Sequence, residues 1–199
     1  MEDRFQIKPG LWDACKAGNK SAYAAIYSAS YPRLFNYGKK FTADEQQIED
    51  AIQEIFTNFW FNRKKLAIVT DPVPYLLVSF RNHLLKSIRK ERTKTRHSEE
   101  ITFDLELSVD QVMIDADKMY EQKITLTYAL EKLTAHQKEA IFLKFYENLS
   151  YDNISGIFGI STRATYKLVA RAVAELRTAY KLKLASSLLS LLSFFIPYY

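Results

Sequence analysis

The chain has 199 residues, of which 48% are hydrophobic, so it is long enough to bury a core as one domain or as two small ones. Only 5 glycines and 5 prolines are present, too few for the closely spaced turns of hairpins and sandwiches. The one cysteine, Cys15, excludes an intramolecular disulfide framework and a multi-cysteine zinc site. Composition therefore favours an all-α fold built from long helices.

The net charge of +5 is unevenly distributed along the chain. Residues 79–97 carry +6, from seven Lys and Arg against Glu91, whereas residues 98–118 carry −6, from seven acids against Lys118. A basic segment beside an acidic one indicates two different surroundings, a polyanion for the first and a basic groove for the second. The opening residues MEDRFQIKPG lack the basic and then apolar pattern of a signal peptide, so we expect a cytoplasmic protein.

The first part of the chain predicts a small helical domain over residues 8–97. Residues 11–31 have helical apolar spacing, and Pro32 is expected to break or kink that helix and to start a short second one ending at Phe41. Asp44, with Gln47 three residues later, resembles a capping box and opens a strongly periodic helix that runs to Trp60. After a loop containing two prolines, a further helix resumes at Tyr75; its apolar face is Leu77, Phe80, Leu84 and Ile88.

The second part predicts a helical domain over residues 119–183, which an acidic linker, 98–118, joins to the first. Helices are expected over 119–133, over 135–147 with Thr134 and Gln137 as a capping box, and over 151–158. Gly159 suits the position after a helix end, and Ser161 suits the N-cap of a longer fourth helix. The apolar tail, 184–199, is too short to span a bilayer, so we expect it on the core, on a partner or on a membrane surface.

A short helix, the turn GIS and a basic helix form the pattern of a helix-turn-helix. The second helix of that motif enters the major groove, with base-reading residues on its first two turns and phosphate-binding residues nearer its ends. The alternative to a DNA-binding helix is an ordinary charged surface helix. The candidate DNA-binding residues are Ser161, Thr162, Arg163, Thr165, Tyr166, Lys167 and Arg171, of which Arg163 suits a guanine edge and Arg171 a phosphate.

Two further polar faces precede the linker. Asp50, Gln53, Glu54 and Thr57 recur at i, i+3, i+4 and i+7, which makes one continuous surface, either a protein-binding face or ordinary solvated surface. The second face lies on a basic helix and favours nucleic acid over a merely solubilising role. Its candidate residues are Ser79, Asn82, Lys86, Arg89 and Lys90.

No constellation of residues predicts an enzyme. His83, His97 and His136 lack ligand-like spacing, and the chain has no glycine-rich phosphate loop and no GxSxG motif. We therefore expect no catalytic residue, no metal, no cofactor and no small-molecule substrate.

Taken together, the two halves resemble the extracytoplasmic-function group of bacterial sigma factors, within the sigma-70 family. Residues 49–60, EDAIQEIFTNFW, are similar to that family's polymerase-clamp helix, and residues 73–92 are similar to its minus-10 helix. Residues 149–177, LSYDNISGIFGISTRATYKLVARAVAELR, resemble its minus-35 reader, although Ala164 and Tyr166 make this recognition helix unusual. The resemblance covers about residues 11–180 and keeps two independent motifs in order.

The resemblance implies a transcription initiation factor that joins core RNA polymerase to promoter DNA. It assigns the Asp50 face to the polymerase and the Ser79 face, with the loop from Ala67 to Asp71, to the minus-10 element; the Ser161 to Arg171 set goes to the minus-35 element. The linker would thread toward the RNA exit channel, and an anti-sigma factor stays open as a further partner. The alternatives are a stand-alone dimeric helix-turn-helix regulator and a scaffold anchored by the apolar tail.

Overall fold

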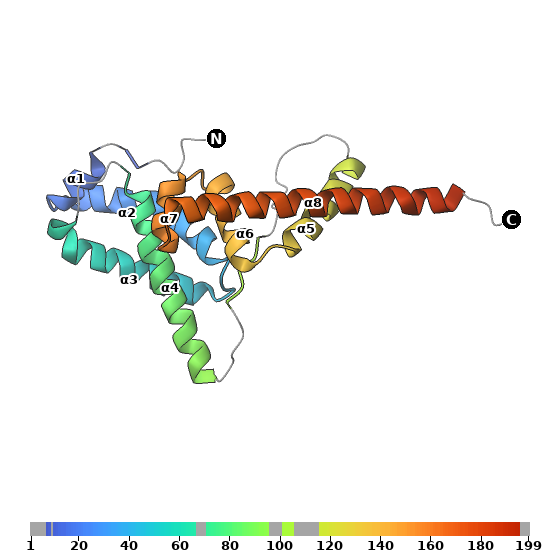
Figure 1. Ribbon diagram of the computed structural model, residues 1–199. Coiled ribbons are helices and arrows are strands. Elements are labelled where there is room, and N and C mark those ends of the chain that lie inside the picture. Colours follow the sequence, from blue (N-terminus) through green and yellow to red (C-terminus); the bar gives the residue numbers. More distant parts are fainter. Residues whose placement is uncertain (1–6, 9, 67–70, 96–100, 106–115, 196–199) are drawn as a thin grey trace. The chain divides into compact units, whose positions relative to one another are not determined.

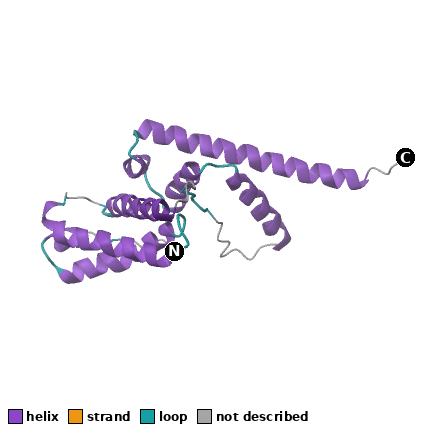
Figure 2. Cartoon of the chain, turned by 90° about the horizontal axis from the view of Figure 1, so that it is seen from below, coloured by secondary structure: helices purple, strands orange, loops and turns teal. Residues whose placement is uncertain are grey.

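The computed structural model describes residues 7–8, 10–66, 71–95, 101–105 and 116–195, with side chains left out at 94–95, 116–123 and 183–195. The described residues form helices and loops and no strands, which confirms the all-α prediction (Figure 1, Figure 2). Two compact units make up the chain: Met1–Thr102 with Ser155–Gly159, and Phe103–Ile154 with Ile160–Tyr199.

The first unit is a bundle whose helices pack pairwise, α1 on α2, α2 on α3, and α4 on both α2 and α3. The predicted apolar faces of α3 and α4 are buried in its core, together with α2 residues such as Leu34 and Tyr37. The helices are α1 (Leu11–Lys16), α2 (Lys20–Gly38), α3 (Glu45–Asn62) with the 3-10 turn η1 (Arg63–Lys65), and α4 (Val73–Thr95).

Two expectations for this unit were wrong. Residues 11–31 form two helices, because Gly18 adopts a positive φ of 96° and Asn19 caps α2 by accepting a hydrogen bond from Ala22 N (3.0 Å). Pro32 neither breaks the helix nor starts a second one, since α2 continues through it to Gly38. Buried residues on both sides of Pro32, among them Ile26 and Leu34, hold the helix together despite the hydrogen bond that proline cannot make.

Local signals placed the next two helices well. Asp44 caps α3 by accepting a hydrogen bond from Gln47 N (3.0 Å), as predicted. The Gln47 amide does not complete a capping box; it reaches α4, where its Nε2 donates to Ser87 Oγ (3.3 Å). Helix α4 begins at Val73, two residues before the expected start, because the Asp71 carboxylate accepts a hydrogen bond from Val73 N (3.0 Å).

The second unit packs α5 and α6 against α8, the long helix that Figure 1 colours orange to red. The capping box of Thr134 and Gln137 is present at α6. The α-helix ends at Ile141, and the chain continues as a π-helical turn within the range expected for one helix. Its elements are α5 (Ala116–Glu131), α6 (Ala135–Ile141), η2 (Phe142–Tyr146) and α8 (Thr162–Phe195), and α7 (Tyr151–Phe158) begins in this unit and ends in the first.

Part of the expected linker lies inside the second unit. Phe103 is 2% exposed and packs on Phe142 with ring centroids 5.7 Å apart, and Leu105 packs against the apolar cluster of α5, α6 and α8. Helix α5 begins at Ala116, within the range 98–118. Residues 96–100 and 106–115 lie outside the described part of the chain.

Candidate nucleic-acid and protein interfaces

Helices α7 and α8 form the predicted helix-turn-helix. Gly159 follows α7 with a φ of 66°, a conformation that glycine adopts without a steric penalty. Ser161 caps α8, because its Oγ accepts a hydrogen bond from Ala164 N (3.2 Å). The Thr162 hydroxyl donates to the Asp152 carboxylate of α7 (2.7 Å), so a side-chain hydrogen bond joins the starts of the two helices.

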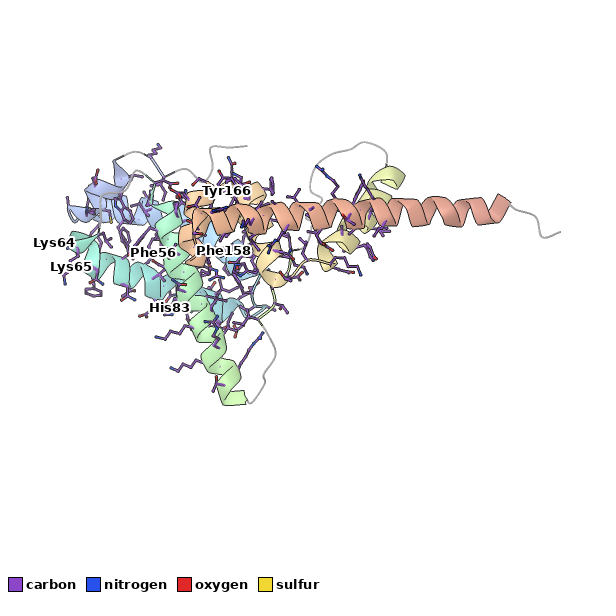
Figure 3. The ribbon with its side chains drawn as sticks, viewed as in Figure 1. Phe56, Lys64, Lys65, His83, Phe158 and Tyr166 are labelled. Atoms are coloured by element: carbon purple, nitrogen blue, oxygen red, sulfur yellow. The ribbon has the colours of Figure 1, made fainter. Side chains whose placement is uncertain are left out.

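The solvent-facing stripe of α8 begins in its first turn. Arg163, Tyr166, Lys167 and Arg171 are exposed and lie three or four residues apart, so they share one face of the helix. Figure 3 shows Tyr166 near the start of α8. The opposite face is apolar and buries Val169 and Ala172. The exposed stripe thus carries three cations and one aromatic ring.

Thr165 is a correction to the candidate DNA-binding set. Its side chain is 0% exposed, and its hydroxyl donates to the carbonyl of Ser161 (3.2 Å). The residue lies on the buried face with Val169, four positions later. Ser161 and Thr162 are not buried in this way, and each uses its hydroxyl group in one hydrogen bond within the motif.

Sequence reasoning missed the neighbours of Tyr166. Its ring stacks on Tyr151, the first residue of α7, with centroids 3.8 Å apart and an interplanar angle of 25°. The Lys144 ammonium lies 4.7 Å from the Tyr151 ring centroid and also donates to the carbonyl of Leu149 (3.1 Å). No local pattern links residues 15 positions apart in sequence, since the turn itself brings them together.

The predicted basic face of α4 is accessible. Asn82, Lys86, Arg89 and Lys90 are exposed and Ser79 is half-buried, while Phe80 and Leu84 on the other face lie in the core. His83 is half-buried and is labelled on α4 in Figure 3. The residues of the loop from Ala67 to Thr70, expected to act with this face, lie outside the described residues.

The α3 stripe is also accessible, since Asp50, Gln53, Glu54 and Thr57 are all exposed. Asp50 accepts a hydrogen bond from Gln46 Nε2 (2.8 Å), and Glu54 accepts one from Asn58 Nδ2 (3.2 Å). These bonds within one helix hold two carboxylates on the surface and leave acceptor capacity for a partner. The opposite face of α3 is buried, with Ile52 and Phe56 in the core.

An open recess of about 350 Å³ adjoins Thr57, and sequence reasoning did not identify it. Phe61 at its rim is 77% exposed, and the Arg63 guanidinium lies 4.2 Å from the Trp60 ring centroid. Exposed aromatic rings of this kind are enriched at protein interfaces. Its lining residues are Lys20, Tyr23, Thr57, Trp60 and Phe61.

The His, Cys, Asp and Glu side chains of the described residues form no metal centre. No group of three or more His, Cys, Asp or Glu side chains there could hold a metal ion. Cys15 is buried, and desolvation raises the pKa of its thiol, although the nearby Arg63 charge lowers it in part. Over the same residues, no helix is long and apolar enough to cross a membrane. The exposed stripes of three helices are candidate binding surfaces. The α3 stripe is acidic and polar, the α4 face is basic, and the α8 stripe is basic and contains an aromatic ring.

Comparison with protein families matches both units. The family described as Sigma-70 region 2 matches residues 26–94, and that described as Sigma-70, region 4 matches residues 124–176. The first range contains the α3 and α4 faces, and the second contains the helix-turn-helix.

Individual relatives agree with these matches. The chain is 24% identical over 140 residues to the ECF RNA polymerase sigma factor SigK of Mycobacterium ulcerans (strain Agy99), covering 69% of this chain and 74% of that protein. Among solved structures, the sigma factor RpoE, crystallised with the anti-sigma factor NepR from Bartonella quintana, has a TM-score of 0.54 at 20% identity. That match covers 81% of this chain and 96% of RpoE. CnrH in complex with the cytosolic domain of CnrY has a TM-score of 0.58 at 16% identity, covering 89% and 99% of the two chains.

Proposed function

We propose that this chain, which belongs to the extracytoplasmic-function group of the sigma-70 family, holds core RNA polymerase through α3 and reads promoters through α4 and α8. It is an RNA polymerase sigma factor, and sigma factors are regulators that start transcription. Presence of region 2 and region 4 in one chain, in family order, carries the proposal. A stand-alone dimeric regulator is not favoured, because it has no use for a region 2 domain.

The polymerase-binding face that we propose is the α3 stripe of Asp50, Gln53, Glu54 and Thr57. Its support is the exposure of all four residues on one side of a helix whose other side is fixed in the core. The recess beside Thr57 extends this face with aromatic side chains, which supply large contact areas to a protein partner.

The minus-10 surface that we propose is the basic face of α4. Unpaired bases need polar groups and phosphates need cations, and this face offers Asn82 beside Lys86, Arg89 and Lys90, all exposed. Ser79, half-buried one turn earlier, completes the set. The charge of +6 over residues 79–97 suits the backbone of nucleic acid.

The minus-35 surface that we propose is the α8 stripe of Arg163, Tyr166, Lys167 and Arg171. Both arginines are exposed, and we assign Arg163, in the first turn, to the O6 and N7 atoms of a guanine and Arg171, two turns later, to a phosphate. Thr165 does not belong to this surface, since it is buried.

We propose that residues 8–97 bind the polymerase and the minus-10 element and that residues 119–183 bind the minus-35 element. Residues 98–118 would form the linker between them, and residues 184–199 an apolar tail. The acidic linker, with a charge of −6, would occupy a positively charged channel of the polymerase by imitating the RNA polyanion. Within this range, Phe103 and Leu105 pack in the second unit. The chain would act in the cytoplasm and carry no catalytic residues, because the polymerase performs the chemistry.

An anti-sigma factor is a further partner that we propose. RpoE was crystallised with the anti-sigma factor NepR, and CnrH with the cytosolic domain of CnrY. Competition for the α3 face would be the simplest mode of inhibition, since a polymerase and an inhibitor cannot occupy it together.

Transcription by a reconstituted holoenzyme tests the proposed function. Core polymerase mixed with this chain should produce transcripts from promoters selected out of a randomised library, whereas the core alone and the chain alone should not. Sequence-specific binding of duplex DNA by the chain alone, with no gain when the core is added, would favour the stand-alone regulator instead.

A further inference from the structure

We propose that Tyr166 selects a thymine in the minus-35 element through the 5-methyl group of that base, and that Tyr151 holds the Tyr166 ring in position for this contact. The inference rests on the proposed function of α8 and adds a specificity-determining contact to it.

The ring of Tyr166 is both accessible and fixed. It is 53% exposed on the groove-facing stripe of α8, yet one of its faces is covered by Tyr151, with centroids 3.8 Å apart. The Lys144 ammonium lies 4.7 Å from the centroid of the Tyr151 ring, so Tyr151 has a second partner besides Tyr166. The Tyr166 ring therefore stacks on a residue that other contacts also hold.

Base chemistry narrows what this ring can recognise. In the major groove every base presents hydrogen-bonding groups, but thymine alone adds an apolar methyl group. An exposed aromatic ring gains base-specific apolar contact from thymine alone. Ala170, one turn later on the same stripe, is also exposed and apolar, so this part of the helix surface between the cations suits a methyl group.

A pre-positioned ring is what such a contact requires. A free tyrosine side chain would lose rotamer entropy when it docks in a groove, whereas stacking on Tyr151 has already restricted it. Tyr151 itself lies at the first residue of α7 and acts through Tyr166, so we assign it a positioning role.

Replacing thymine with deoxyuridine tests the contact, because only the methyl group is removed. The holoenzyme first selects promoters from a library randomised over the minus-35 element. Each thymine of that element, on either strand, is then changed to deoxyuridine and holoenzyme affinity is measured. For the wild-type chain we expect one position at which affinity falls roughly fourfold, the equivalent of one buried methyl group.

Variants identify the residues responsible. Tyr166→Ala should abolish the difference between thymine and deoxyuridine at that position, and Tyr166→Phe should keep it, since the phenyl ring remains. Tyr151→Leu should reduce the difference and Tyr151→Phe should restore it, a pattern that a merely structural role would not give. Lys167→Ala is the matched control, because it should weaken binding equally to the promoter with thymine and to the promoter with deoxyuridine at that position.

Several results would overturn the inference. No deoxyuridine effect at any thymine, or an effect that survives Tyr166→Ala, would remove the methyl contact while leaving the sigma function intact. Loss of the effect in Tyr166→Phe would transfer recognition to the hydroxyl group, and an unchanged effect in Tyr151→Leu would remove the positioning role. Failure of the wild-type holoenzyme to select any promoter would instead refute the proposed function, and the inference with it.

Discussion

Gly38 of α2 and Ile48 of α3 touch so closely that a Cβ atom on Gly38 would lie 2.7 Å from Cγ2 of Ile48. The same Cβ would lie 3.0 Å from Cζ of Phe80 on α4, so Gly38 is the point at which three helices of the first unit meet. Ile48 and Phe80 are both 0% exposed, which leaves neither side chain room to move away.

Gly38→Ala should therefore destabilise the chain even though alanine is the better helix former. The gain in helix propensity is about 1 kcal/mol, and overpacking a rigid core costs about 1–3 kcal/mol. We expect a net loss of up to about 2 kcal/mol in the free energy of unfolding, measured by denaturant titration. Gly156→Ala is the control: its Cβ would meet nothing within 4 Å in α7, so it should stabilise by about 0.5–1 kcal/mol.

Asn148 is the non-glycine residue that adopts a positive φ, 53°, within the described part of the chain. Asparagine tolerates this left-handed conformation better than most residues, and glycine does so without a Cβ penalty. Asn148→Gly should keep or raise the melting temperature, whereas Asn148→Val should lower it by several degrees. A valine variant as stable as wild type would show that the turn before α7 relaxes easily.

Arg163 is exposed and Thr165 is buried, although both lie in the first turn of α8. Arg163→Ala should cost about 1–3 kcal/mol at one or two promoter positions and relax specificity there. Thr165→Val, which keeps the shape of a side chain that is 0% exposed, should leave promoter preference unchanged. Library selection with each variant holoenzyme provides the measurement, and equal losses on every sequence for Arg163→Ala would contradict base reading.

Lys86 on α4 should behave as a phosphate contact. Lys86→Ala should weaken promoter binding by the holoenzyme evenly across sequences and reduce the slope of log K against log salt by about one unit. Lys39→Ala is a suitable control, because Lys39 is exposed but pairs with Glu45 (3.2 Å) at the end of α2. An unchanged slope for Lys86→Ala would place that side chain away from the DNA.

Local chemistry made most helices predictable. The caps at Asp44, Thr134 and Ser161 rest on residues three positions apart, and each is present in the structure. At Pro32 local chemistry gave a wrong prediction, a helix start. The packing of α2 against the other helices outweighs the tendency of one proline to interrupt a helix.

The candidate surfaces were also predictable only in part. The polar stripes of α3 and α4 were visible as periodicity, whereas Thr165 was placed on the wrong face of α8. A signal was available there, since Thr165, Val169 and Ala172 follow the helical spacing of the buried side. The contact between Tyr151 and Tyr166 has no such signal, because it depends on how the turn brings two helices together.

Affinity for core RNA polymerase tests the central claim most directly. The wild-type chain should bind the purified core tightly, and the Asp50→Ala, Gln53→Ala double variant should lose about tenfold or more, since both side chains are exposed and point away from the core of the bundle. Glu45→Ala is the matched control, because it also removes an exposed carboxylate from α3 but lies outside the stripe. A folded double variant that binds the core as tightly as wild type would contradict the account.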